Sequence, residues 1–359
     1  MVTRSRRLKI SLMTHGVAVA SRARVLLTGV DGTSPLTLAD YASTSGITLR
    51  LPDDVWVNAP LDAHNSNFVT APRHTLDFVD GQFVVRGDGM ESQVTPIPVP
   101  SYHAETNAQG EPYTSYAVTH TDRVRISPVE GCAIACRFCD LPFEFRYRAK
   151  RVDGLVDAVG RALVDRVLPA RHVLISGGLP RDSDFEWMQR VWESVPAAFP
   201  GIEVDVMMVP APGLVVPSRL KKAGVSGLSI NLEIWNLDVA ARVMPGKARI
   251  GRARWLEVIA DAVATFGTGR VRSLLLVGIE PLDDTLRAVE ALASLGCDPV
   301  LSPFRPDPAT PMRSHRPPSE ELLVEAWERG SEIVARHGVR LGPRCVPCMH
   351  NTLSFPEAP

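Results

Sequence analysis

The sequence predicts an α/β protein whose largest part is a partial (β/α)6 barrel, and two observations carry that prediction. From Arg123 onward, short apolar runs alternate with longer amphipathic stretches, which is the pattern of strands alternating with helices. Parallel strands need helical crossovers between them, so this alternation indicates a parallel sheet. Right-handed crossovers then curl the sheet into a full or partial barrel, with chemistry beyond the carboxyl ends of its strands.

The elements of this barrel follow one another in a regular order. Strands are predicted at 123–128, 173–176, 202–209, 227–232, 273–278 and 299–304. Helices are predicted near 152–168, 184–198, 217–223, 252–266, 284–295 and 319–337.

The segments on either side of the barrel differ from it in character. Residues 1–122 alternate turn-rich stretches with short β-prone pieces, which lie at 25–27, 47–51 and 78–85. The Pro-rich segment 94–100 is typical of a linker or an edge strand. We therefore expect the chain to have three parts. These are a β-rich N-terminal extension over 1–122, the barrel over 123–338 and a cysteine-containing tail over 339–359.

Composition limits the classes of partner. The 359-residue chain carries a net charge of −1, whereas a phosphate-binding surface needs clustered Lys and Arg, so we expect a small-molecule substrate and no nucleic acid. No apolar run approaches the roughly 20 residues of a membrane helix, so we expect no membrane partner. The basic N-terminus is interpreted as mature sequence rather than a secretory signal. Six cysteines are too few for a disulfide scaffold, and their clustering indicates reduced thiols that bind metal in a cytoplasmic protein.

Three of the cysteines form a short motif directly after the first predicted barrel strand. Cys132, Cys136 and Cys139 have the spacing C-x3-C-x2-C. Three thiolates on one loop can hold three irons of a [4Fe–4S] cluster and leave the fourth iron open to a small molecule. A structural zinc site would instead want four closed ligands, and no second cysteine pair lies nearby in the sequence.

This motif, with the aromatic Phe138 before its last cysteine, resembles the signature of the radical S-adenosylmethionine (SAM) superfamily. The resemblance implies a radical SAM barrel in which SAM binds the open iron through its amino and carboxylate groups. It also implies that one electron, from a reductase or a flavodoxin- or ferredoxin-type donor, splits SAM into methionine and a 5′-deoxyadenosyl radical. That radical would abstract a substrate hydrogen, while the protein supplies orientation and shielding from water.

Two strand-end segments resemble SAM-binding segments of the superfamily, in particular of biotin and lipoyl synthases. Gly177 and Gly178 match a methionine-binding G-G-E segment, but Leu179 replaces the acid, so only backbone contacts carry over. Asn231 and Glu233 match an N-x-N-L-(D/E)-T segment, which implies that their side chains bind the ribose hydroxyls. A carboxylate suits that role because it accepts two hydrogen bonds.

Two further positions resemble the same families. Arg254 lies in a stretch similar to one in lipoyl synthases and becomes the candidate partner of the SAM carboxylate, because a guanidinium pairs with a carboxylate through two hydrogen bonds. Gly278 lies in V-G-I-E, similar to V-G-L-G-E, although the second glycine is missing. Both are taken as cofactor-binding positions, and no side chain is assigned as catalytic.

A second cysteine pair, Cys345 and Cys348, follows the last helix with C-x2-C spacing. Such a pair suits an auxiliary iron–sulfur cluster, a zinc site or a redox disulfide. Biotin and lipoyl synthases use a second cluster as sulfur donor, but this chain lacks their additional cysteine groups. His350 is one candidate for a further ligand, and Cys297 is interpreted as a buried structural thiol.

The leading functional hypothesis is a radical SAM sulfurtransferase that abstracts hydrogen from an unactivated carbon and inserts sulfur from an auxiliary cluster. The alternative within the superfamily is a rearrangement or dehydrogenation by the same radical without sulfur transfer. The alternative of another class is a non-catalytic, zinc-binding interaction protein.

Overall fold

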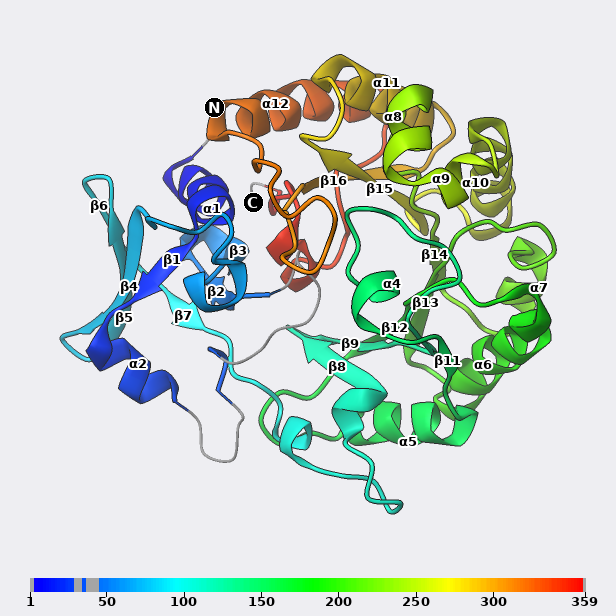
Figure 1. The fold of residues 1–359 in the computed structure, drawn as a ribbon, viewed down its shortest axis with the longest axis horizontal. Helices are drawn as coiled ribbons and strands as arrows, with labels where there is room; N and C mark the ends of the chain where they lie inside the picture. The colour runs from blue at the N-terminus through cyan, green and yellow to red at the C-terminus, as the bar shows by residue number, and fades with distance from the viewer. Residues whose placement is uncertain (1–2, 29–33, 37–44, 358–359) are drawn as a thin grey trace.

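The computed structural model describes residues 3–28, 34–36 and 45–357. Its centre is a curled seven-stranded sheet with the strand order β16-β15-β14-β13-β12-β9-β8 (Figure 1). The strands are β8 (Ala117–His120), β9 (Arg123–Ile126), β12 (His172–Ile175), β13 (Glu203–Met207), β14 (Gly227–Ser229), β15 (Val271–Val277) and β16 (Asp298–Pro303).

The strands from β9 to β16 are parallel to their neighbours, and only β8 is antiparallel to β9. The predicted α/β class with an open, curled sheet is thus confirmed. One strand, β8, was not predicted. It forms a hairpin with β9 and lies before Arg123, so the barrel sheet extends into the segment that was assigned to the N-terminal extension.

Helices cover the outer face of the sheet (Figure 1). In α10, Trp255, Val258, Ile259 and Ala262 are buried, and their spacing of three and four residues places them on one face of the helix. The long covering helices are α5 (Val152–Leu163), α6 (Phe185–Ala198), α10 (Arg252–Phe266), α11 (Leu282–Ser294) and α12 (Glu320–His337), with the shorter α7 (Pro217–Lys222).

Short elements that the sequence analysis did not predict surround the carboxyl ends of the strands. They are β10 (Val129–Glu130), β11 (Arg148–Ala149), α4 (Leu141–Glu144), α8 (Leu237–Val243), α9 (Pro245–Ala248) and the 3₁₀ helix η5 (Asp182–Asp184). Each is too short to show a clear hydrophobic period.

The N-terminal part combines helices with two small sheets beside the barrel. The sheets have the orders β1-β4-β5-β6 and β3-β2-β7. Their strands are β1 (Val17–Val19), β2 (Ile47–Arg50), β3 (Trp56–Ala59), β4 (His74–Val79), β5 (Gln82–Gly87), β6 (Met90–Gln93) and β7 (Thr95–Pro96). The helical elements are α1 (Arg4–His15), α2 (Ser21–Leu27), α3 (Asp62–Asn65), η2 (Pro52–Asp54), η3 (Ser101–Ala104) and η4 (Tyr113–Ser115).

Segment 25–27 was predicted as β-prone, and that prediction is wrong because these residues end α2. Ala23 is fully buried, whereas Val25 is 74% exposed, so the apolar run does not bury as a strand would. A run of three apolar residues carries too little periodicity to separate a strand from a helix. The segments 47–51 and 78–85 do contain strands, the second as the hairpin of β4 and β5.

The C-terminal tail returns along the edge of the barrel. Its backbone pairs with β16, because Gly342 N donates to Pro299 O at 2.7 Å and Leu353 N donates to Leu301 O at 2.8 Å. The 3₁₀ helix η6 (Pro347–Asn351) lies between this edge and the N-terminal part. From α1, the buried Lys9 donates from Nζ to Met349 O at 2.7 Å, so the tail connects the two halves of the molecule.

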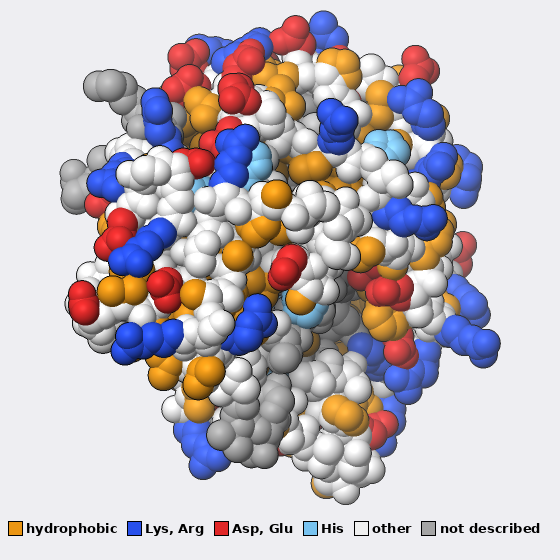
Figure 2. All heavy atoms as spheres, turned by 60° about the vertical axis from the view of Figure 1, so that its left-hand side comes forward, with side chains coloured by type: hydrophobic (Ala, Val, Ile, Leu, Met, Phe, Trp, Pro, Cys, Tyr) orange, Lys and Arg blue, Asp and Glu red, His pale blue; other side chains and the backbone are white. Residues whose placement is uncertain are grey.

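The face turned forward in Figure 2 carries interspersed basic and acidic side chains rather than a field of one sign. That distribution does not favour a polyanion over other partners. Among the described helices, none combines the length and the apolar character needed to cross a bilayer.

Candidate active site at the carboxyl ends of the strands

The loop that carries the first three cysteines is closed at its base by a small hairpin. β10 pairs antiparallel with β11, which brings the two ends of the loop together. Gly131, the residue after β10, has φ of 70°, a left-handed conformation that glycine adopts without steric cost. Within the loop Cys136 is buried, whereas Cys132 and Cys139 are half-buried. The hairpin therefore fixes three thiols at the carboxyl end of the sheet.

Gly178 allows the end of β12 to touch this loop. A Cβ atom at that position would lie 1.8 Å from Gly131 O and 2.8 Å from Cys132 Cα, distances that no side chain can occupy. Next to it, Leu179 N donates to Cys132 Sγ at 3.2 Å, and Ala133 N donates to Leu179 O at 3.0 Å. The glycine that was predicted to contact SAM therefore has a second role, because it seats the cysteine loop against the sheet.

The three thiols open onto a cavity of about 230 Å³. Most of the residues predicted from the sequence line it. They are Cys132, Cys136, Phe138, Cys139, Gly177, Gly178, Asn231 and Glu233.

A buried ion pair forms part of the same cavity wall. Lys247 Nζ lies 2.7 Å from Glu233 Oε2, and the two side chains are only 13% and 11% exposed. Burial alone would lower the pKa of Lys247, but the negative Glu233 and the neighbouring Cys136 raise it above its ordinary value. Lys247 is therefore a charged ammonium beside the thiols.

Glu233 is held by an unusual backbone. Its φ of 65° is rare for a residue with a side chain and costs free energy, which is a feature often found at functional sites. Its amide donates to Leu274 O at 2.8 Å and its carbonyl accepts from Leu276 N at 2.9 Å, so β15 holds the strained residue in place. Asn231 is fixed to the same strand, because its Oδ1 accepts from Leu274 N at 3.2 Å.

The sequence analysis missed Lys247. The signal for it was the Pro-Gly pair that precedes it, because Pro245 starts the short helix α9 that carries the lysine. Gly246 also packs closely on the cysteine loop, where an added Cβ would lie 2.9 Å from Ile134 Cβ. Lys247 lies close to the cysteine motif in space but far from it in the sequence, so its place beside the thiols could not be inferred from the sequence.

The donor set fits an iron–sulfur cluster that has an open side. Burial raises the pKa of Cys136 to about 12 and that of Cys139 well above its ordinary value, so these thiols ionise only when a cation is bound to them. Among the described residues, the loop thiols form no group compact enough for a single ion. They line a cavity together, as ligands around a larger cluster would.

No family model matches the chain, but parts of it are similar to known proteins. The chain is 31% identical over 121 residues to the bacteriochlorophyllide c C-7(1)-hydroxylase of Chlorobaculum limnaeum, a stretch that is 33% of this chain and 30% of that protein. Among solved structures, a radical SAM methyltransferase from Sphaerobacter thermophilus matches with a TM-score of 0.46 and 20% identity, over 74% of each chain. The [FeFe]-hydrogenase maturase HydG of Carboxydothermus hydrogenoformans matches with a TM-score of 0.46 and 16% identity, over 60% of this chain and 52% of that one.

The cysteine motif lies at the carboxyl end of a curled parallel sheet, and it opens onto a cavity lined by the strand-end residues that resemble SAM-binding segments. The geometry of the site agrees with the resemblance to the radical SAM superfamily that the cysteine motif carries. Cys132, Cys136 and Cys139 are the residues that would hold a [4Fe–4S] cluster here.

Two of the positions predicted to bind SAM lie outside the cavity. Arg254 does not line the cavity, because its side chain is 37% exposed and pairs with Glu257 at 3.0 Å, so the structure does not bring it to the three thiols. The helix was predicted correctly, but its register turns Trp255 inward and Arg254 outward. Gly278 likewise does not line the cavity, and its φ of 102° with Pro318 packed against it indicates a structural turn.

The tail cysteines lie at the other end of the sheet. Cys345 Sγ and Cys348 Sγ each lie 3.5 Å from Nε2 of His172, the first residue of β12. Gly177, by contrast, follows the end of that strand and lines the cavity of the cysteine loop. Gly177 lies five residues after His172 along the extended chain, which separates the two by on the order of 15 Å. Cys297 is fully buried, as predicted.

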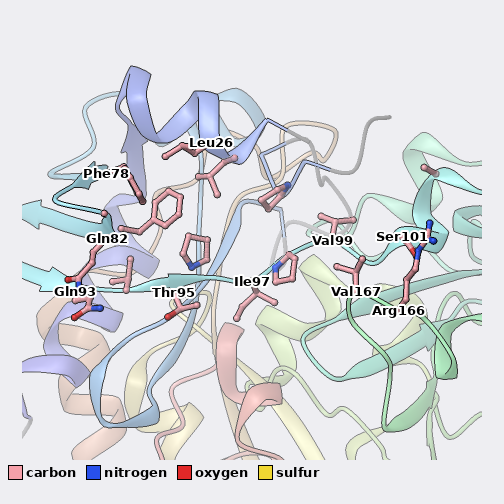
Figure 3. Close-up of a pocket in the computed structure, with 18 of the residues that line it drawn as sticks. Leu26, Phe78, Gln82, Gln93, Thr95, Ile97, Val99, Ser101, Arg166 and Val167 are labelled. Atoms are coloured by element: carbon pink, nitrogen blue, oxygen red, sulfur yellow. The ribbon is translucent and has the colours of Figure 1, made fainter. Parts of the chain in front are cut away.

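A larger hollow of about 930 Å³ is lined mostly by the N-terminal part, together with Arg166 and Val167 of the barrel (Figure 3). Leu26, Phe78, Ile97 and Val99 are among its apolar walls, and Arg166 lies at one side. It contains no thiol among the described residues, so its size does not make it the candidate active site.

Proposed function

We propose that this protein is a radical SAM enzyme that functionalises a carbon–hydrogen bond of a small-molecule substrate. The observation that carries the proposal is the convergence of three loop thiols and a buried Lys247–Glu233 pair on one cavity. When bound at Cys132, Cys136 and Cys139, a [4Fe–4S] cluster with one open iron supplies the electron that cleaves SAM into methionine and a 5′-deoxyadenosyl radical.

The residues of the cavity then bind and orient SAM. The carboxylate of Glu233 accepts hydrogen bonds from the ribose hydroxyls, and Lys247, which donates to it at 2.7 Å, keeps that carboxylate aligned. Lys247 also takes the role first assigned to Arg254, because its ammonium is the buried cation beside the thiols and can pair with the SAM carboxylate. Phe138 and Trp255 line the same wall and exclude water from the radical.

Sulfur insertion is not part of the proposal. An auxiliary cluster on Cys345 and Cys348 would lie at the amino ends of the strands, whereas the substrate must reach the carboxyl ends. A sulfur donor has to contact the substrate carbon, and a separation on the order of 15 Å prevents that contact. We therefore favour radical chemistry without sulfur transfer, such as rearrangement or dehydrogenation.

The partial likeness to a hydroxylase supports the attack on a carbon–hydrogen bond. That relative, by its name, acts at carbon 7(1) of bacteriochlorophyllide c, so it replaces hydrogen on carbon. The present chain spans about a third of its length, and we extend to it only the class of bond that is attacked. We further propose a small protein electron donor of the flavodoxin or ferredoxin type, as the superfamily requires.

The test is SAM cleavage by anaerobically reconstituted, dithionite-reduced enzyme. We expect 5′-deoxyadenosine to form with wild type and with Cys297→Ala, a matched variant that removes a buried thiol outside the cavity. Cys136→Ala should form none and should lose the brown colour of the cluster, because one iron loses its protein ligand. Wild-type protein that binds zinc instead of iron and leaves SAM intact would support a non-catalytic zinc protein and overturn the proposal.

A further inference from the structure

The tail cysteines belong to a compact group of four potential metal ligands. Cys345 and Cys348 come from the tail, Asp122 immediately precedes β9, and His172 begins β12. Their ligand atoms all lie within 4.8 Å of one another, and no other such group occurs among the described residues. The two cysteines were predicted as metal ligands from the sequence, but neither Asp122 nor His172 was predicted to join them.

The distances within this group match the edges of a tetrahedron around one ion. His172 Nε2 lies 3.4 Å from Asp122 Oδ1 and 3.5 Å from each of the two sulfurs. Asp122 Oδ1 lies 3.4 Å from Cys345 Sγ and 3.9 Å from Cys348 Sγ. Zinc bonds of about 2.0–2.3 Å place tetrahedral N, O and S ligands about 3.3–3.8 Å apart.

We propose that Asp122, His172, Cys345 and Cys348 bind one structural zinc ion that fastens the C-terminal tail to the amino ends of the barrel strands. Two thiolates, one imidazole and one carboxylate are ligands that zinc takes in proteins, and four of them close its coordination shell. This inference goes beyond the SAM chemistry of the opposite end and does not depend on it.

An auxiliary iron–sulfur cluster fits the same group poorly. A cubane is far larger than a single ion, and its four ligands stand outside separate irons rather than against one another. The cysteines are free thiols in this structure rather than a disulfide. The close approach of one carboxylate and two ionisable thiols is therefore explained best by a single cation between them.

The surroundings of the group provide both access and charge balance. It opens onto a depression of about 690 Å³, and only Cys348 is fully buried, so an ion can enter from solvent. Zinc with two thiolates and one carboxylate carries a net charge of −1. Arg123 lines the same depression and supplies a positive charge, whereas Arg272 there pairs with Asp205 at 2.7 Å.

The ligand positions are fixed by contacts that do not involve the ion. Arg171 N donates to Asp122 O at 2.8 Å, which places the loops before β9 and β12 side by side. In the tail, Arg344 Nε lies 2.9 Å from Asp298 Oδ2 at the start of β16. Zinc binding at such a prearranged site would connect the barrel to η6. Lys9 of α1 donates hydrogen bonds to Met349 O in η6 and to Ser354 O just after it. The ion is therefore expected to stabilise the junction of all three parts.

The direct test is metal content of the full chain after purification with zinc present and anaerobic cluster reconstitution. Wild type should contain about one zinc per chain in addition to its iron. Asp122→Asn, a conservative change that keeps the shape of the side chain, should bind zinc at least tenfold more weakly. Cys345→Ser/Cys348→Ser should retain no zinc, whereas the matched Cys297→Ala should keep it, because that buried thiol is outside the group.

A spectroscopic measurement keeps the proposal testable if the double variant does not fold. Cobalt(II) added to wild-type protein without its iron should give the intense visible bands of tetrahedral coordination and a thiolate charge-transfer band. Asp122→Asn should shift or weaken those bands. Zinc-free wild type, six-coordinate cobalt without thiolate charge transfer, or extra iron and sulfide that depend on Cys345 and Cys348 would each overturn the proposal.

Discussion

The two ends of the barrel sheet carry two cysteine groups with opposite properties. At the carboxyl ends, three thiols line a cavity and have no fourth protein ligand among the compact groups of described residues. At the amino ends, two thiols converge with a carboxylate and an imidazole on a single point. An open ligand set is what a reactive metal needs, and a closed set is what a structural metal needs. The comparison therefore assigns chemistry to one end and stability to the other.

The largest effect is expected where the cysteine loop meets β12. In Gly178→Ala the new Cβ would lie 1.8 Å from Gly131 O, so the loop must move away from the strand. Since a shift of about 1 Å in a reacting group can cost 100-fold in rate, 5′-deoxyadenosine formation should fall by at least about that factor. The measurement is SAM cleavage together with iron content.

Gly160→Ala is the control for that variant, because it adds the same methyl group in helix α5. Its Cβ would lie 3.6 Å from Phe199, an ordinary contact, and alanine is the better helix former. Equal cleavage by Gly178→Ala and Gly160→Ala would show that the loop does not depend on this close approach.

A smaller effect on binding is expected from the ion pair in the cavity. Lys247→Met removes the ammonium that pairs with Glu233 at 2.7 Å and leaves a buried carboxylate without its partner. We expect SAM to bind roughly 10- to 100-fold more weakly, as is typical when one member of a buried charge pair is lost. Equilibrium dialysis with the reconstituted, unreduced protein measures this change.

Arg254→Met serves as the matched comparison, because it removes a nearby cation that faces solvent and pairs with Glu257. Its SAM affinity should equal that of wild type. A loss of affinity in Arg254→Met, with Lys247→Met unaffected, would reverse the assignment made from the structure.

On the amino side of β12, the contact between η3 and the loop after α5 should contribute stability rather than chemistry. Burial alone would raise the pKa of Asp165, but hydrogen bonds from Leu168 N, Ser101 Oγ, Val167 N and Tyr102 N lower it to about 2. A carboxyl whose pKa is lower in the folded than in the unfolded state stabilises the fold above its unfolded pKa, near 4. This stabilisation, about 2 kcal/mol, is lost as the pH falls from about 4 to 2.

Urea unfolding at a series of pH values measures that contribution. Asp165→Asn should be less stable than wild type at pH 7, and the difference should shrink toward pH 2 while SAM cleavage by the folded protein stays unchanged. Asp153→Asn, an exposed acid on α5, should behave like wild type throughout. If the difference in free energy of unfolding between wild type and Asp165→Asn did not change with pH, the charge of Asp165 would not be what stabilises the contact between η3 and the loop after α5.

Much of the barrel could be predicted because its signals are local. Helix α10 begins and ends at the predicted residues Arg252 and Phe266, since its apolar spacing and a glycine on either side mark both ends. The cysteine motif could be identified for the same reason, because all three thiols lie on one short loop. By contrast, α2 was taken for a strand, because its apolar run is too short to have a period.

The rest of the candidate sites depends on contacts between distant segments. Nothing local shows that Asp122 and His172 meet Cys345, because that contact requires the tail to return along β16 to the amino ends of the strands. Similarly, Lys247 reaches Glu233 only because α9 packs on the cysteine loop. Sequence patterns indicate which residue types are reactive, whereas the fold decides which of them become neighbours.

The most direct test of the contrast between the two ends is the iron and sulfide content after anaerobic reconstitution, measured for wild type and for Cys345→Ala/Cys348→Ala. We predict about four irons and four sulfides per chain in both proteins, since the carboxyl-end loop holds the one cluster. About eight irons in wild type that fall to about four in the double variant would contradict the account, because the amino end would then hold a second cluster.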